Sequence, residues 1–319
     1  MMVQKPQVSI IIPCKEVDKY TEECIGHCKR LDYPNFEIIL LPDNSYGALN
    51  GVKVIATGPV APGLKRNIGV KNSSGEFCAF IDNDAYPRSD WLTNVLQPFE
   101  DPQVGGIGGP GLTPKTDSLL QKAGGYVLTS FMVGNLTSRY KAKGCFESDD
   151  IHSCNFVARK TVIEAAGGWN EKYWPGEDTL MCLAIRKLGK KLIESSDVVV
   201  YHHRRSLFKP HLKQVSRFGE HRGFFAKKFP ENSAKLTYFF PSLLVLFPII
   251  AVLLSLFFPF FAYVLLFGAA AYLVVSLIAA GLQVRRIKLL FSVWLGIITT
   301  HIIYGSFFLS GLVKRDLKR

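Results

Sequence analysis

The feature that most constrains this chain is a nearly continuous apolar stretch from Leu236 to Val313. Its only Asp, Glu, Lys or Arg residues are Arg285, Arg286 and Lys288. A helix needs roughly 18 or more apolar residues to cross the hydrocarbon core of a bilayer. Three segments of the stretch satisfy this condition: Leu236–Phe258, Pro259–Leu282 and Leu289–Val313. We therefore predict an all-α membrane region of two to three helices over residues 236–319.

The apolar stretches allow either two or three true spans. Basic residues that flank spans favour the cytosolic side. That preference applies both to the cluster at residues 285–288 and to Lys314, Arg315, Lys318 and Arg319. Three full spans that start in the cytosol would place the second cluster outside, and prolines at 241, 248 and 259 leave room for one re-entrant or interfacial stretch.

Residues 1–235 mix charge, glycine, proline and short apolar runs, as soluble α/β domains do. The net charge of +12 is concentrated in a basic juxtamembrane segment at about residues 203–235, which favours anionic lipid headgroups. We expect no nucleic-acid partner, because the segment adjoins apolar stretches and matches no nucleic-acid motif. A strand-like run, Val8–Ile12, follows the first residues directly, without a signal-peptide pattern. We therefore expect a multi-pass protein of the cell membrane with residues 1–235 on the cytosolic side.

Short apolar runs alternate with helical segments through the soluble part, which predicts a mostly parallel sheet flanked by helices. The predicted strands are Val8–Ile12, Phe36–Leu41, Val52–Ile55, Phe77–Ile81, Val104–Gly111, Asn155–Ala158, Lys191–Ile193 and Val198–Tyr201. The predicted helices are Tyr20–Arg30, Leu64–Ser74, Ser89–Phe99, Thr161–Ala166 and Thr179–Leu188.

One predicted strand ends at a pair of carboxylates, Asp82 and Asp84. The next residues, Ala85-Tyr86-Pro87, should not continue a ladder, because proline lacks the N–H donor. Open α/β folds bind ligands at the carboxyl ends of their strands. Two carboxylates one residue apart can share a hard divalent cation there. The alternative is an ordinary turn rich in Asp and Asn.

A second acidic site follows the aromatic loop at residues 169–176. The loop brings Glu177 and Asp178 to the start of a predicted helix, where the helix dipole favours carboxylates. Capping alone is therefore one interpretation. Because Trp169, Tyr173 and Trp174 would be excessive for a cap, we favour a functional Asp178 beside an aromatic-lined pocket.

Five motifs in sequence order make residues 7–229 resemble the family 2 inverting glycosyltransferases, which have a GT-A fold. The residues that carry the resemblance are Val8–Pro13, Asp43, Arg66-Asn67 with Gly69, Phe80–Asp84 (similar to a DxD element), and Gly167–Asn170 with Gly176–Asp178.

The resemblance implies a role for each matching residue. Nucleotide-sugar contacts fall to Pro13, Glu16, Asp43, Arg66, Asn67, Asp82 and Asn83. Asp84, with Asp82, would bind Mg2+ or Mn2+, and we add His203 as a further candidate ligand; a solvated histidine is the alternative. Asp178 would be the general base. Acceptor or phosphate contacts fall to Trp169, Trp174, Glu177, Gln214 and Arg217.

Gln214 and Arg217 belong to a run, Gln214–Phe218, that is similar to the QxxRW element of processive polysaccharide synthases. An amphipathic helix at the membrane interface explains the run equally well.

We therefore expect a membrane-attached, metal-dependent, inverting hexosyltransferase. It would move a sugar from a nucleotide-diphosphate donor to a lipid-linked or membrane-proximal acceptor in cell-envelope glycan or glycolipid synthesis. Two alternatives are a processive polysaccharide synthase and a non-catalytic sugar-nucleotide-binding membrane protein. The expected domains are 1–235 and 236–319.

Overall fold

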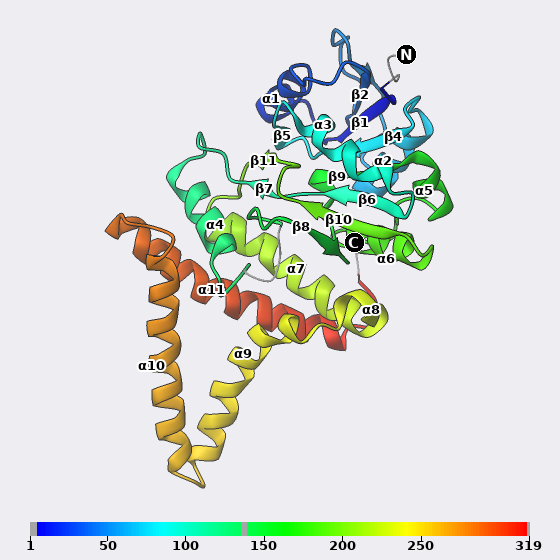
Figure 1. The fold of residues 1–319 in the computed structure, drawn as a ribbon. Helices are drawn as coiled ribbons and strands as arrows, with labels where there is room; N and C mark the ends of the chain where they lie inside the picture. Colours follow the sequence, from blue (N-terminus) through cyan, green and yellow to red (C-terminus); the bar gives the residue numbers. More distant parts are fainter. Residues whose placement is uncertain (1–4, 135–138, 318–319) are drawn as a thin grey trace. The chain divides into compact units, whose positions relative to one another are not determined.

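A computed structural model describes residues 5–134 and 139–317 (Figure 1). The described residues form two compact units. The first contains residues 5–114 and 139–203, and the second contains residues 115–134 and 204–317. The basic juxtamembrane segment is thus grouped with the apolar helices.

The first unit is built on an eight-stranded sheet of order β3-β2-β1-β4-β9-β6-β10-β8. The β1, β2, β3 and β4 pairings are parallel, as is β6 with β10, whereas β9 and β8 run antiparallel to their neighbours. The strands are β1 (Val8–Pro13), β2 (Phe36–Leu41), β3 (Lys53–Val54), β4 (Phe77–Phe80), β6 (Val104–Gly108), β8 (Cys145–Ser148), β9 (Phe156–Arg159) and β10 (Lys191–Ser195). This arrangement confirms the predicted α/β fold with a mostly parallel central sheet.

Helices cover both faces of the sheet. Successive side chains of a strand point to opposite faces, so each strand contributes residues to two cores. Ile10 and Ile12 of β1 pack in a core with α1 (Lys19–Cys28) and α3 (Trp91–Leu96), while Ile11 packs in the core that contains residues of the other helices. Those helices are α2 (Pro62–Lys71), α5 (Lys160–Ala165) and α6 (Glu177–Lys187). Two 3-10 helices, η1 (Gln97–Glu100) and η2 (Ser153–Asn155), complete the unit.

A small second sheet corrects one expectation. Ala85–Pro87 leaves the main sheet as predicted, but it forms β5, which pairs with β11 (Val200–His202) in a sheet of order β5-β11-β7. The third strand, β7, is Gly111–Leu112. Pro87 is tolerated because β5 is an edge strand and loses no ladder bond that a neighbour requires. The pairing sets His202 opposite Ala85, next to the carboxylate turn.

The described part of the second unit is helical. It contains α4 (Leu119–Thr129), α7 (Lys209–Lys228), α8 (Pro230–Ser233), α9 (Leu236–Ser255), α10 (Phe260–Gly281) and α11 (Ile287–Val313). The last three are long and apolar enough to cross a membrane, in agreement with the predicted all-α membrane region. Side chains of α4, α10 and α11 share one hydrophobic core.

Candidate active site

The carboxylate turn lies where β4 ends, and its two aspartates meet a histidine from β11. One ligand atom from each of Asp82, Asp84 and His202 lies within 4.8 Å of the others. His202 Nε2 is 3.2 Å from Asp84 Oδ1. Asn83 turns away, and its amide donates to Thr21 Oγ1 at 3.0 Å.

The donor set of this cluster fits a hard divalent cation. Carboxylate oxygens are ligands that Mg2+ and Mn2+ accept, and imidazole is a ligand of first-row transition metals. Burial disfavours a charged His202, but neighbouring Cys154 and Asp84 outweigh burial, so the pKa of His202 is raised well above its usual value. A cation would compete with that proton, since only neutral imidazole coordinates metal.

His203, the histidine predicted as a metal ligand, lies elsewhere. Its Nε2 is 2.8 Å from Glu23 Oε2, and its ring packs against Tyr20. His202 is the last residue of β11 and lies at the two aspartates, whereas His203 follows the strand and pairs with Glu23. Among the described residues, the cluster that could hold a metal contains His202 in place of His203, so the prediction for His203 is corrected.

Arg66 of α2 joins the carboxylate turn to the second acidic site. Its guanidinium donates to Asp82 Oδ1 at 3.0 Å, to Glu177 Oε1 at 2.8 Å and to Ser153 Oγ at 2.9 Å. The Arg66 side chain is 3% exposed and stacks over the Trp169 ring at 4.9 Å. Arg66 therefore contacts the protein on several sides, which leaves little of it for the nucleotide contact that we predicted.

Glu177 is also less accessible than predicted. It is buried at the first position of α6 and paired with Arg66. Burial raises the pKa of Glu177 to about 7, with Arg66 opposing the rise and Asp178 adding to it. A buried carboxylate in an ion pair is suited to holding Arg66 and α6 in place, and it is a poor acceptor contact.

Asp178, the predicted base, is the next residue of α6 and is 17% exposed. Its Oδ1 accepts the Thr179 N–H at 2.8 Å, and its Oδ2 lies 3.7 Å from Arg139 Nη1. Arg139 also pairs with Asp150 at 2.8 Å. These two contacts fix the orientation of the Asp178 carboxylate.

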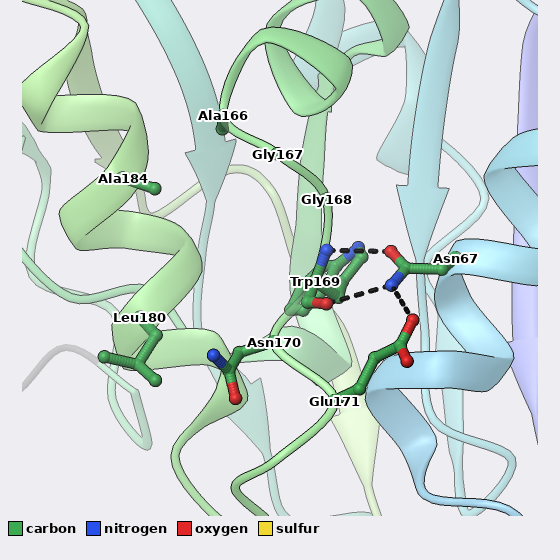
Figure 2. Close-up of a pocket in the computed structure, with 9 residues that line it drawn as sticks. All are labelled: Asn67, Ala166, Gly167, Gly168, Trp169, Asn170, Glu171, Leu180 and Ala184. Atoms are coloured by element: carbon green, nitrogen blue, oxygen red, sulfur yellow. Dashed lines mark hydrogen bonds between the residues drawn. The ribbon is translucent and has the colours of Figure 1, made fainter.

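Asn67 forms hydrogen bonds to the end of the glycine-rich loop that leads into Trp169 (Figure 2). Its amide donates to Trp169 O at 2.9 Å and to Glu171 Oε1 at 2.8 Å, and its Oδ1 accepts the Trp169 N–H at 2.7 Å. A Cβ on Gly168 would lie 2.9 Å from Asn67 Oδ1, at a φ of +78° that favours glycine. Asn67 therefore positions the loop, and the nucleotide contact predicted for it stays a prediction.

Trp169 itself is 2% exposed and packs edge-on against Phe80 and Phe156. The predicted acceptor contact at Trp169 is therefore replaced by a role in the core beneath Arg66. The pocket drawn in Figure 2, about 340 Å3, lies along this loop and is lined by none of the acidic residues Asp82, Asp84 and Asp178. Trp174, in contrast, is 51% exposed just before α6, where the acceptor contact predicted for it stays a prediction.

The predicted nucleotide side lies at the carboxyl ends of β1 and β2. Pro13 ends β1, and Asp43 follows β2. Buried Lys65 joins the two strand ends: its Nζ bonds Cys14 O at 2.7 Å, Leu41 O at 3.1 Å and Asp43 Oδ1. Glu16 is exposed in the loop after β1.

Gln214 and Arg217 belong to the second unit, on α7, where Gln214 is half-buried and Arg217 is exposed. The roles predicted for them stay predictions.

Sequence reasoning missed His202, Lys65 and Arg139. Lys65 stands next to Arg66 in the recognised motif, whereas His202 is placed by the pairing of β11 with β5. No local pattern marks Arg139, whose carboxylate partners lie 11 and 39 residues later along the chain, at Asp150 and Asp178.

Residues 9–166, about half of the chain, match the family model described as "Glycosyl transferase family 2". The chain is 23% identical over 241 residues to dolichyl N-acetyl-alpha-D-glucosaminyl phosphate 3-beta-D-2,3-diacetamido-2,3-dideoxy-beta-D-glucuronosyltransferase of Methanococcus voltae, which covers 69% of this chain and 74% of the relative. It is 24% identical over 178 residues to pre-mycofactocin glycosyltransferase of Mycobacterium tuberculosis, with 55% of this chain and 37% of the relative covered. The chain thus spans well under two thirds of the second relative.

Among solved structures, the chain is similar to the mannosyltransferase PcManGT from Pyrobaculum calidifontis in complex with GDP-Man and Mn2+. The TM-score is 0.57 at 17% identity, over 98% of this chain and 88% of the other. At this identity the similarity concerns the fold.

Proposed function

Because the chain belongs to glycosyl transferase family 2 and has a GT-A-like fold, we propose that it is a membrane-attached, inverting glycosyltransferase. It takes a hexose-type sugar from a nucleotide-diphosphate donor. It transfers that sugar to a hydroxyl of a lipid-linked or membrane-proximal acceptor on the cytosolic face. The product belongs to a cell-envelope glycan or a glycolipid.

One observation carries the proposal: a single buried arginine, Arg66, connects the residues that could bind a divalent metal ion to the helix start that carries the candidate base. Arg66 contacts Asp82 of the donor set and Glu177, the neighbour of Asp178. Transfer from a diphosphate needs two groups in fixed relation, one at the leaving group and one at the attacking hydroxyl. The Arg66 link supplies that relation within one unit of the fold.

Asp82, Asp84 and His202 would hold Mn2+ or Mg2+, with Mn2+ favoured because imidazole is a ligand of transition metals. The cation would neutralise charge on the departing diphosphate. Asp178 would accept the proton of the acceptor hydroxyl as that oxygen attacks the anomeric carbon from the face opposite the leaving group. A single attack of this kind inverts the anomeric configuration, and a second catalytic carboxylate is not required.

Two comparisons support the choice of substrates. The Methanococcus voltae relative is named for a dolichyl sugar phosphate, a lipid-linked acceptor. The Pyrobaculum calidifontis neighbour was solved with a nucleotide-diphosphate sugar and Mn2+. Three helices that are apolar enough to cross a membrane favour an acceptor at the bilayer surface.

A panel of UDP-, GDP- and dTDP-sugars tests the proposal on the purified full chain. With Mn2+ present, we expect one donor class to bind, and to release its nucleoside diphosphate when polyprenyl-phosphate sugar acceptors are added. EDTA should abolish the release, and added Mn2+ should restore it. Binding without transfer to any lipid or soluble acceptor would contradict the enzyme assignment, and full transfer in EDTA would contradict the metal assignment.

A further inference from the structure

α7 and α11 lie side by side in the second unit (Figure 1). Near one end of the contact, His211 Nε2 is 2.9 Å from Thr300 Oγ1. Near the other end, Lys227 Nζ donates to Leu312 O at 3.0 Å. The residue numbers rise together, so the two helices run in the same direction. The contact covers residues 211–227 of α7, which corresponds to roughly 24 Å of helix.

The two backbones approach closely along this contact. A Cβ on Gly223 would lie 2.0 Å from Phe308 O, and a Cβ on Gly219 would lie 2.6 Å from Tyr304 O. Small residues allow such an approach between helices. α7 and the C-terminal half of α11 therefore form one tightly packed pair, and they must occupy the same depth relative to a membrane.

α7 is too polar to lie in the hydrocarbon core. Lys213, Arg217 and Lys228 are exposed, and charged side chains are rare and costly at bilayer depth. If α11 crossed the bilayer, its partner α7 would carry these charges into the core.

Contacts with α9 and α10 point the same way. Ser242 Oγ near the start of α9 donates to Gly305 O at 3.2 Å, and Trp294 Nε1 donates to Ser276 Oγ near the end of α10 at 2.9 Å. In contrast, Phe257 at the far end of the α9–α10 hairpin is 77% exposed. The hairpin extends away from α11 in Figure 1, whereas a third span in the same bundle would run along it.

α11 has two different long faces. Val293, Ile297 and Phe308 are fully buried, whereas the opposite face exposes apolar residues. The exposed residues are Ile287, Phe291, Leu295, Ile302 and Val313. Together, α7 and α11 offer a basic surface beside an apolar one, the pattern of a helix that lies in the membrane interface.

We propose that only α9 and α10 span the bilayer, and that α11 lies with α7 at the boundary between lipid headgroups and acyl chains. The exposed apolar face of α11 contacts acyl chains, and the lysines and arginines of α7 contact anionic headgroups. The basic residues at 285–288 and at 314–315 then lie on the same side of the membrane as α7. Both basic clusters can therefore be cytosolic, as basic residues that flank spans prefer, which three full spans would not allow. This inference does not depend on the proposed catalytic activity.

Cysteine labelling tests the topology in the full chain. The native exposed thiol, Cys145, marks the side of the first unit, and the other six cysteines are buried. In a Cys145→Ser background, Arg285→Cys, Arg315→Cys and Phe258→Cys are treated with a membrane-impermeant maleimide in spheroplasts and in inverted vesicles. We expect positions 285 and 315 to be labelled at least ten-fold better in the preparation that labels Cys145, and position 258 in the other one. A three-span chain would instead label position 315 together with position 258.

Depth measurements give an independent outcome if a cysteine variant folds poorly. A bimane fluorophore at Phe291, Ile302 or Val313 of α11 is quenched by lipids brominated at shallow or deep acyl positions. We expect all three sites to prefer the shallow quencher equally, with Ile249 of α9, which is 55% exposed, as the deep control. Position 302 deeper than both 291 and 313 would show that α11 spans the bilayer and would overturn the proposal.

Discussion

Arg66 forms the ion pairs that connect the two acidic parts of the site. It carries one positive charge between Asp82 and Glu177, two carboxylates that neither reach each other nor share another cation in the described contacts. Asp82 is 31% exposed and Glu177 is 5% exposed. Water can therefore screen the first carboxylate, whereas the second depends on Arg66.

Arg66→Met should destabilise the first unit by about 3–5 kcal/mol, because it leaves the buried Glu177 carboxyl without its partner. Thermal unfolding of the detergent-solubilised chain measures this effect. Adding Glu177→Gln to Arg66→Met should restore part of the stability, since the second change removes the buried ionisable group. Donor transfer should remain low in both variants, because neither restores the link to Asp82. If the double variant were no more stable than the single one, the pair would not be the cause.

Asp178→Asn should lower sugar transfer by about 100- to 10,000-fold, the usual contribution of a general base. Donor binding should persist, because the substitution keeps the shape of the side chain and leaves Asp82, Asp84 and His202 intact. Asp101→Asn is the matched control: this surface carboxylate is 48% exposed and pairs with Lys191 at 3.9 Å, and we expect near-normal turnover. Near-normal turnover of Asp178→Asn itself would remove the base assignment.

The sequence identified the site residues that follow a strand end and missed those fixed by distant contacts. Asp82 and Asp84 were found because they directly follow the apolar run that forms β4. The choice between His202 and His203 depends on the pairing of β11 with β5, more than a hundred residues earlier. Arg66 was recognised from its motif, but its burial depends on Glu177, 111 residues away. Local patterns carry no information on such distant contacts.

Helices and strands were predicted correctly where the spacing of apolar residues matched only one type of secondary structure. The three apolar helices and the strands of the main sheet fall close to their expected ranges, except β8, for which no strand was predicted. α4 was missed because glycines at 124 and 125 weaken its helical signal, although Ser118 and Gln121 form a capping box readable from the sequence. α7 was anticipated as a basic segment with one possible amphipathic helix at Gln214–Phe218, and its packing on α11 was not, since α11 lies about 90 residues later.

The packing of α7 on α11 should be sensitive to a single methyl group. Gly223→Ala places a Cβ 2.0 Å from Phe308 O, and the helices must separate, at a cost of about 1–3 kcal/mol. Apparent melting temperature in detergent measures the loss. In Gly268→Ala, the new Cβ meets only Phe247 at an ordinary 3.6 Å, so this control should be neutral or slightly stabilising. Equal stability of the two variants would mean that the close approach of α7 and α11 does not exist.

At the scale of the whole molecule, the described chain enters the second unit twice, at residues 115–134 and again from residue 204. A boundary at residue 235 follows the change in composition, which is the signal that the sequence offers. The compact units are defined by contacts between residues instead: Val127 of α4 packs in the same core as Val293 and Ile297 of α11. A cut at residue 235 would remove α11 while leaving α4 and α7 in place.

A chain that ends at Lys235 should therefore aggregate. The apolar faces of α4 and α7 lose their cover, at roughly 1.5–3 kcal/mol for each large side chain newly exposed to water. Size-exclusion chromatography should place this truncation in the void volume without detergent. The matched variant removes only residues 248–267 and links Phe247 to Gly268 through a short Gly-Ser turn.

Phe247 and Gly268 face each other across the α9–α10 hairpin, since a Cβ on Gly268 would lie 3.6 Å from the Phe247 ring. The shortened chain keeps the contacts of α11 with α4, α7, Ser242 and Ser276. It should elute as a single species in detergent and retain donor binding, since the deletion touches no residue of the first unit. A monodisperse, detergent-free truncation at Lys235 would show instead that residues 1–235 fold independently of α11.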